Sequence, residues 1–167
     1  MRSQDIANME NNKSERNVAL ALGLIFFILG VAGFLPSFLS LPNDAGIPIQ
    51  AEPSLYSKGF GYIFGVFPTN LIHDFIRILV GLTGIIMSRD TQGARVYCRV
   101  FAYLYALIAI LGILPFGKTF FGLMPIFGNN VWLNGLTAAI AAYFGFIKPI
   151  SETGEVAVSP PEIIKER

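Results

Sequence analysis

Four long apolar stretches, separated by polar or proline-containing segments, dominate the pattern of the chain. Stretches of this length predict membrane-spanning helices, because an α-helix rises about 1.5 Å per residue and the hydrocarbon core of a membrane is about 30 Å thick. The sequence therefore predicts an all-α membrane protein with one transmembrane domain over residues 17–147. The four transmembrane helices are expected at about residues 18–41, 70–88, 96–114 and 131–147.

Both ends of the chain are polar. Residues 1–16 and 148–167 offer little apolar surface to bury, so we predict disordered tails on either side of the domain. A cleaved signal peptide is the alternative for the first apolar stretch, with Val31-Ala32-Gly33 as a small-residue site. That stretch is longer than the roughly 7–15 apolar residues of a signal core, and acidic residues precede it. We therefore expect it to be retained as the first helix.

Segments rich in glycine and aromatic residues precede the second and fourth helices. Residues 60–67 are too few to cross a membrane, and their rings favour a position in the membrane interface. The first helix ends in the sequence GFLP and the third in GILP, and FGVFPTN (64–70) is echoed by MPIFGNN (124–130). The sequence thus predicts a unit of helix, interfacial connection and helix that occurs twice in the same orientation.

Lysine and arginine residues are unevenly distributed between the connections. The two tails and the short link between the second and third helices carry most of them, whereas the two longer connections carry only Lys58 and Lys118. Because basic residues mark the cytoplasmic side of a membrane protein, we expect both termini in the cytoplasm.

Composition excludes several classes of function. Charged residues make up only 14% of the chain, against about 25% in soluble domains, and the net charge of +1 argues against a nucleic-acid partner. The single cysteine, Cys98, and the single histidine, His73, exclude an internal disulfide and a two-histidine metal or haem site. Sequence motifs of catalysis and phosphate binding are absent as well. We therefore predict that the protein is not an enzyme and holds no cofactor.

A cluster of polar side chains lies in the first two turns of the second helix. The spacing of Asn70, Asp74 and Arg77 places them on one face, with His73 beside it. Asn70 is expected to cap the helix, and Asp74 to pair with Arg77. Asn134, on the fourth helix, is a second buried polar candidate. Polar groups are costly inside a membrane, so these residues form the candidate functional site.

Three interpretations of this cluster stay open. In the structural one, Asp74 complements the positive end of the helix and Arg77 extends to the membrane interface. In the functional one, His73 handles protons or a ligand, because histidine changes charge near neutral pH. In the third, Arg77 docks a partner subunit or a lipid headgroup.

Small residues recur three or four positions apart on the helices, as they do where membrane helices pack closely. A cofactor groove or an interface with another subunit is the alternative to packing inside the chain. The residues expected to face the interior of the bundle are Gly81, Gly84, Gly135, Ala138 and Ala142.

The segment FGVFPTNLIHDFIRILVGLTG (64–84) resembles a family of uncharacterised bacterial membrane proteins, the domain-of-unknown-function family 4383. Its pattern of Gly-x-Phe-Pro-x-Asn, a histidine and Leu-x-Gly-x-x-Gly is matched here, and a second segment is matched at Asn130 and Trp132. Arg77 and Asn134 stand where members often have histidine, so a two-histidine site could not form in the same way. The resemblance implies four membrane helices over about residues 18–147 and no established activity.

These observations favour a small integral membrane protein that acts as an accessory or assembly subunit or as a homo-oligomer, in contact with membrane lipids. A proton- or ion-coupled transporter that uses the cluster on the second helix is the alternative. The resemblance to bacterial proteins implies a plasma membrane, or a thylakoid membrane in a cyanobacterium.

Overall fold

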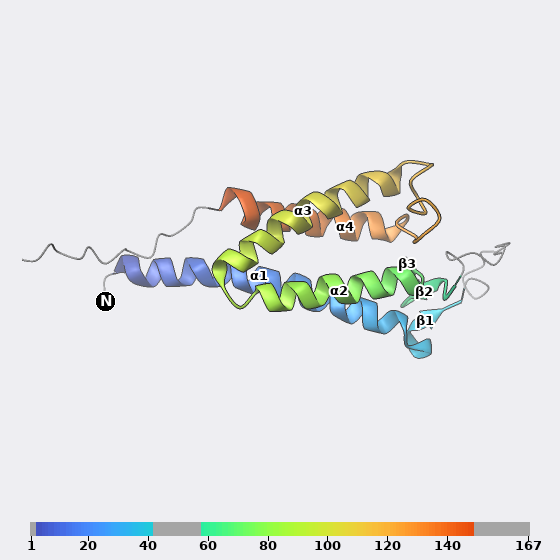
Figure 1. Cartoon of the computed structure of the whole chain (residues 1–167), viewed down its shortest axis with the longest axis horizontal. Helices are drawn as coiled ribbons and strands as arrows, with labels where there is room; N and C mark the ends of the chain where they lie inside the picture. The colour runs from blue at the N-terminus through green and yellow to red at the C-terminus, as the bar shows by residue number, and fades with distance from the viewer. Residues whose placement is uncertain (1–2, 42–57, 149–167) are drawn as a thin grey trace, which may run out of the picture.

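The computed structural model describes residues 3–41 and 58–148 of the 167-residue chain, and this part is mostly helical. Two antiparallel helix pairs lie side by side, one formed by α1 and α2 and the other by α3 and α4 (Figure 1). The helices are α1 (Ser3–Gly33), α2 (Leu71–Met87), α3 (Thr91–Ile113) and α4 (Asn129–Ala142), and α4 continues into the π-helix η2 (Tyr143–Ile147).

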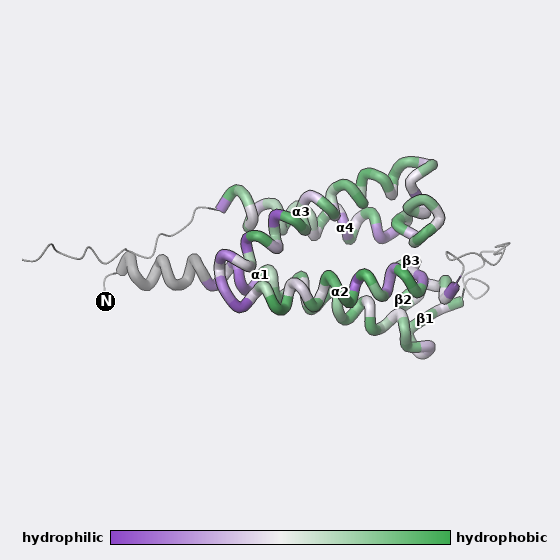
Figure 2. The backbone as a smooth tube through the Cα atoms, viewed as in Figure 1, coloured by the Kyte–Doolittle hydropathy of each residue, from purple (hydrophilic) through white to green (hydrophobic). Residues whose placement is uncertain are grey.

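Three of these helices are long and apolar enough to cross a membrane: Lys13–Gly33, Thr91–Ile113 and Asn129–Ile147. The prediction of a mostly helical membrane protein is thereby confirmed. α2 has 17 residues, and its rise of about 25 Å is somewhat less than the hydrocarbon thickness. Hydrophilic residues gather at the end of the bundle that holds the link between α2 and α3 (Figure 2).

The bounds of the first helix differ from the prediction at both ends. α1 begins at Ser3, within the segment 1–16 that was expected to be disordered, because residues 3–16 contain no glycine or proline and include many good helix formers. α1 ends at Gly33 rather than near residue 41. Pro36 accounts for the early end, since the residue before a proline is driven out of the helical region, and Leu35 is extended at φ −99° and ψ 114°. The predicted tail 149–167 lies outside the described residues.

The all-α prediction missed a small antiparallel sheet of three strands in the order β1-β2-β3. β1 (Leu39–Ser40) pairs with β2 (Gly61–Ile63), and β2 pairs with β3 (Phe67–Thr69). Phe64 and Gly65 both have positive φ, and the Val66 N–H donates to the Ile63 carbonyl, as in a type I′ hairpin turn. The segment expected to lie flat in the interface is therefore a hairpin that leads directly into α2.

The second and third helices begin at side-chain caps. The predicted cap Asn70 is confirmed, because its side chain accepts a hydrogen bond from the His73 N–H. α3 begins at Thr91, five residues before the expected start, because Asp90 accepts a hydrogen bond from the Gly93 N–H and caps the helix there.

Close backbone contact holds α1 against α2. A Cβ added at Gly81 would overlap the Phe27 backbone nitrogen, and one added at Gly23 would lie 2.8 Å from the Gly81 carbonyl oxygen. Gly84 and Ala138 are also buried, as predicted, whereas Gly135 and Ala142 are partly exposed. A Cβ at Gly135 would meet only the Ala109 Cβ, at 3.9 Å, so the packing there does not require glycine.

Aromatic rings join the two helix pairs in the middle of the bundle. Phe26 of α1 makes edge-to-face contacts with Phe101 and Tyr105 of α3, at centroid distances of 5.2 and 4.7 Å. At the hydrophilic end, Lys148 forms an ion pair with Glu15 at 3.0 Å, and the Arg16 Nε donates to the Ser88 carbonyl at 3.0 Å. The start of the first apolar span, the α2–α3 link and the end of η2 therefore lie at the same end of the bundle.

Candidate functional site

A buried group of polar side chains lies at the opposite end of the bundle, where β3 runs into α2. We call it the interhelix polar cluster. Each of its members is at most 6% exposed. The cluster consists of Thr69, Asn70, His73, Asp74, Arg77 and Asn130.

Asp74 and Arg77 form the charged part of the cluster. Their closest atoms, Asp74 Oδ1 and Arg77 Nη1, are 3.9 Å apart, which is too long for a hydrogen bond. The Thr69 hydroxyl lies between them, donating to Asp74 Oδ1 at 2.5 Å and accepting from Arg77 Nη1 at 3.2 Å. One positive and one negative group thus share a single hydroxyl.

Glycine residues of α1 make room for this arrangement. A Cβ added at Gly33 would overlap the Asp74 carboxylate, and one added at Gly30 would lie 2.6 Å from the Asp74 carbonyl oxygen. The glycines at the end of α1 therefore allow a carboxylate to be buried directly between α1 and α2.

Asn130, at the start of α4, connects the cluster to the second helix pair. Its Oδ1 accepts from Arg77 Nη2 at 2.7 Å, and its Nδ2 donates to the carbonyls of Pro68 at 2.7 Å and Pro125 at 2.9 Å. Pro68 lies on the edge strand β3, where a proline is tolerated because no ladder hydrogen bond is needed from its nitrogen. Asn130 thus bonds simultaneously to α2, to the sheet and to its own preceding connection.

Asn70 makes the corresponding contact from the first pair. While its Oδ1 caps α2, its Nδ2 donates to the Leu123 carbonyl of the α3–α4 connection at 2.7 Å. The His73 ring hydrogen-bonds to the backbone of Pro125, which can only accept because proline has no N–H. All three residues that point from the start of α2 towards α4 are therefore bonded to the second connection or its helix.

Three buried nitrogens at this end have no hydrogen-bond partner among the described residues: His73 Nδ1, Arg77 Nε and Asn134 Nδ2. Buried polar atoms are normally satisfied, and ordered water is a common partner. Asn134 is buried one turn beyond Asn130, but no bond joins its side chain to those of His73, Asp74 or Arg77 within the described part of the chain.

The sequence thus identified four members of the cluster and missed Thr69 and Asn130. The echo between residues 64–70 and 124–130 contained a signal for Asn130, because it aligns Asn130 with Asn70. Thr69 could not be distinguished from any other residue before a helix cap. No group of three histidine, cysteine or acidic residues that could hold a metal ion occurs in residues 3–41 and 58–148.

Comparison with known proteins places the chain in a family without assigning it an activity. No curated protein and no solved structure matches it. The family model described as Domain of unknown function (DUF4383) matches residues 16–147, which include all four helices except the first turns of α1 and the whole interhelix polar cluster. The chain therefore belongs to the DUF4383 family.

Proposed function

We propose that this chain is a non-enzymatic integral membrane protein that serves as an accessory or assembly subunit, or as a homo-oligomer, in a bacterial plasma or thylakoid membrane. The observation that carries the proposal is the internal bonding of Arg77. Its guanidinium is 1% exposed and donates to Thr69 and Asn130 of the same chain. A charge occupied in this way acts as a clamp between the helix pairs, so function falls to the outward surface.

That surface is strongly apolar over the helices and connections. Trp132 is 78% exposed, Phe121 73% and Leu136 65%. Exposed apolar groups of this size suit lipid or another membrane protein. On α4, the exposed Ala139 and the partly exposed Gly135 and Ala142 lie beside Leu136, where a partner helix could approach closely.

We further propose that all four helices span the membrane and that both termini are cytoplasmic. Support comes from the antiparallel order of the helices and from the position of residues 15, 88 and 148 at one end of the bundle. α2 needs only slight local thinning of the bilayer to span it. In a Cys98→Ser background, an impermeant maleimide should label Lys58→Cys in intact cells and Arg89→Cys only after permeabilisation; the reverse would invert the topology.

A duplicated unit of helix, connection and helix is part of this proposal. Pro36 and Pro115 follow the ends of α1 and α3 at corresponding places, and Asn70 and Asn130 bond each other's connections. The two connections differ in structure, because only the first contains described strands.

Isolation from native membranes in mild detergent, followed by a native gel and mass spectrometry, tests the accessory function. A stoichiometric partner or a discrete homo-oligomer is expected. Ala139→Leu should release that partner without unfolding the chain, whereas Val100→Leu, on an exposed face of α3, serves as the control. A protein that is monomeric under all of these conditions would refute the proposal.

Proton- or ion-coupled transport is the second candidate. It is favoured by the three unpartnered nitrogens of His73, Arg77 and Asn134, which water or an ion could occupy. In proteoliposomes, His73→Ala or Asp74→Asn should then abolish flux while the protein stays folded. Under the accessory proposal, Arg77→Ala should instead lower stability or release the partner, and no flux should be measured for the unmodified chain.

A further inference from the structure

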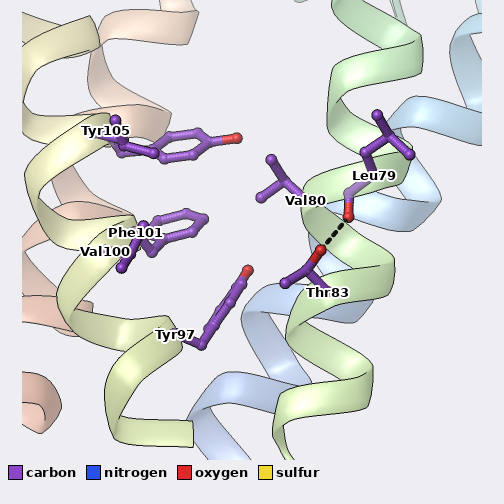
Figure 3. A pocket seen from close by; sticks show the side chains of 8 residues that line it. Leu79, Val80, Thr83, Tyr97, Val100, Phe101 and Tyr105 are labelled. Atoms are coloured by element: carbon purple, nitrogen blue, oxygen red, sulfur yellow. Dashed lines mark hydrogen bonds between the residues drawn. The ribbon is translucent and has the colours of Figure 1, made fainter. Parts of the chain in front are cut away.

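A second feature of the fold lies between α2 and α3, away from the clamp. Here the two helix pairs diverge and leave a cavity of about 170 Å³ (Figure 3). Its walls include Val80 and Thr83 of α2 and Tyr97, Phe101 and Tyr105 of α3. We call this cavity the α2–α3 crevice.

The crevice opens sideways, towards the side of the bundle that lipid would cover. Leu79, Val100 and Leu104 also line it, and they are 48%, 53% and 51% exposed. Since α3 is long and apolar enough to span a membrane, these residues lie at the level of the hydrocarbon. A molecule dissolved in the bilayer could enter without crossing a polar surface.

One polar atom in the crevice lacks a partner. The Tyr97 hydroxyl is buried and makes no hydrogen bond to any described residue. The residue is 6% exposed, and its ring points its oxygen away from α3 and towards α2 (Figure 3). A buried hydroxyl without a partner is unfavourable, so the crevice favours a ligand with an acceptor atom.

The shape of the crevice selects among such ligands. An apolar cavity of about 150 Å³ accommodates a benzene ring, so the space here suits one six-membered ring. The rings of Phe101 and Tyr105 are stacked at 3.9 Å with an interplanar angle of 3°, and Tyr97 tilts from Phe101 at 5.5 Å. Flat rings pack favourably against such a wall. An aliphatic lipid chain could fill the volume, but its methylene groups cannot accept a hydrogen bond.

We propose that the α2–α3 crevice binds a flat, carbonyl-bearing ring that arrives from the bilayer, the chemistry of a lipid-soluble quinone, with the Tyr97 hydroxyl donating to its carbonyl oxygen. The proposal concerns binding only and is independent of the partner protein proposed above.

Two ligands of the same shape test the hydrogen bond. Duroquinone and durene both carry four methyl groups on a six-membered ring, but only duroquinone has carbonyls, and its full substitution prevents addition to Cys98. Binding is measured by calorimetry on the full chain in micelles, with empty micelles subtracted. Tyr97→Phe should weaken duroquinone binding roughly threefold to tenfold, the range of one neutral hydrogen bond, and leave durene binding unchanged.

Tyr103→Phe is the matched control. Tyr103 lies on the same helix but is 69% exposed and does not line the crevice, so its hydroxyl should not affect either ligand. The proposal is overturned if duroquinone does not bind, if Tyr97→Phe binds it as well as the unmodified chain does, or if durene binds as tightly as duroquinone.

A third variant locates the ligand. Val80→Phe places a ring in the crevice and should abolish binding of both compounds while the helical circular dichroism is retained. Should that variant fail to fold, Leu104→Phe at the mouth is used instead. Unchanged binding in a folded blocking variant would place the ligand elsewhere and overturn the proposal, as would displacement of duroquinone by phospholipid without any effect of Tyr97→Phe.

Discussion

Asn70 and Asn130 make reciprocal hydrogen bonds between the two helix pairs. Asn70 donates to the Leu123 carbonyl in the connection before α4, and Asn130 donates to the Pro68 carbonyl in the strand before α2, each at 2.7 Å. Each asparagine stands at the start of its own helix and holds the segment that precedes the other helix. Because the donors and acceptors are buried, the loss of either amide leaves a polar group without a partner.

The first prediction concerns Asn130. Asn130→Ala should lower the free energy of unfolding by about 2 to 4 kcal/mol, because Arg77 loses a charged hydrogen bond and the Pro68 and Pro125 carbonyls lose their donor. Thermal unfolding in detergent measures the effect. Asn129→Ala is the matched control, since Asn129 is exposed and makes one bond of 3.2 Å to Val66. Equal effects at the two positions would contradict a clamp at Asn130.

The second prediction concerns the packing of α1 on α2. Gly81→Ala should destabilise the protein by about 1 to 3 kcal/mol, because the added methyl overlaps the backbone of α1 and a packed interior resists extra volume. Gly135→Ala is the control in the other pair. It has space for a methyl group and should be neutral or stabilising by up to about 1 kcal/mol through higher helix propensity. The order of the two melting temperatures decides the matter.

The third prediction concerns the hydrophilic end. Glu15→Ala should cost about 3 kcal/mol of stability, because it leaves the Lys148 ammonium largely buried without its carboxylate. Lys13→Ala, two residues away and exposed, should change stability by less than about 0.5 kcal/mol. If the added Glu15→Ala change is small in a Lys148→Met background, the loss belongs to the ion pair; if it is undiminished, Glu15 acts in another way.

A fourth prediction uses the hydroxyl of Tyr97 in the ligand-free protein. Because this group has no partner among the described residues, Tyr97→Phe should leave the melting temperature unchanged or raise it. Tyr103→Phe provides the baseline for an exposed tyrosine. A clear decrease confined to Tyr97→Phe would mean that the hydroxyl is already satisfied within the protein.

The sequence predicted the helices more securely than the connections between them. Asn70 as a cap and Pro115 as a stop act over a few residues, and α2 and the end of α3 follow them. The sheet depends on the pairing of Leu39 with Ile63 across 24 residues, and strands of two or three residues show no alternation to detect.

The candidate site was predictable to the same degree. Four of its members stand on a single helix, where spacing reveals a shared face. The partner of Arg77 was not predictable in this way, because Asn130 and Asn134 lie one turn apart and both are buried. Only the relative placement of the two helix pairs brings Asn130, and not Asn134, to the guanidinium.

The central claim, that the interhelix polar cluster clamps the two helix pairs together, is tested most directly by a double-mutant cycle between Arg77 and Asn130. Free energies of unfolding are measured in mixed micelles for Arg77→Met, Asn130→Ala and the double variant. A clamp predicts a coupling energy of about 1 to 3 kcal/mol, since each residue is the other's buried partner. Additive effects of the two substitutions would contradict it.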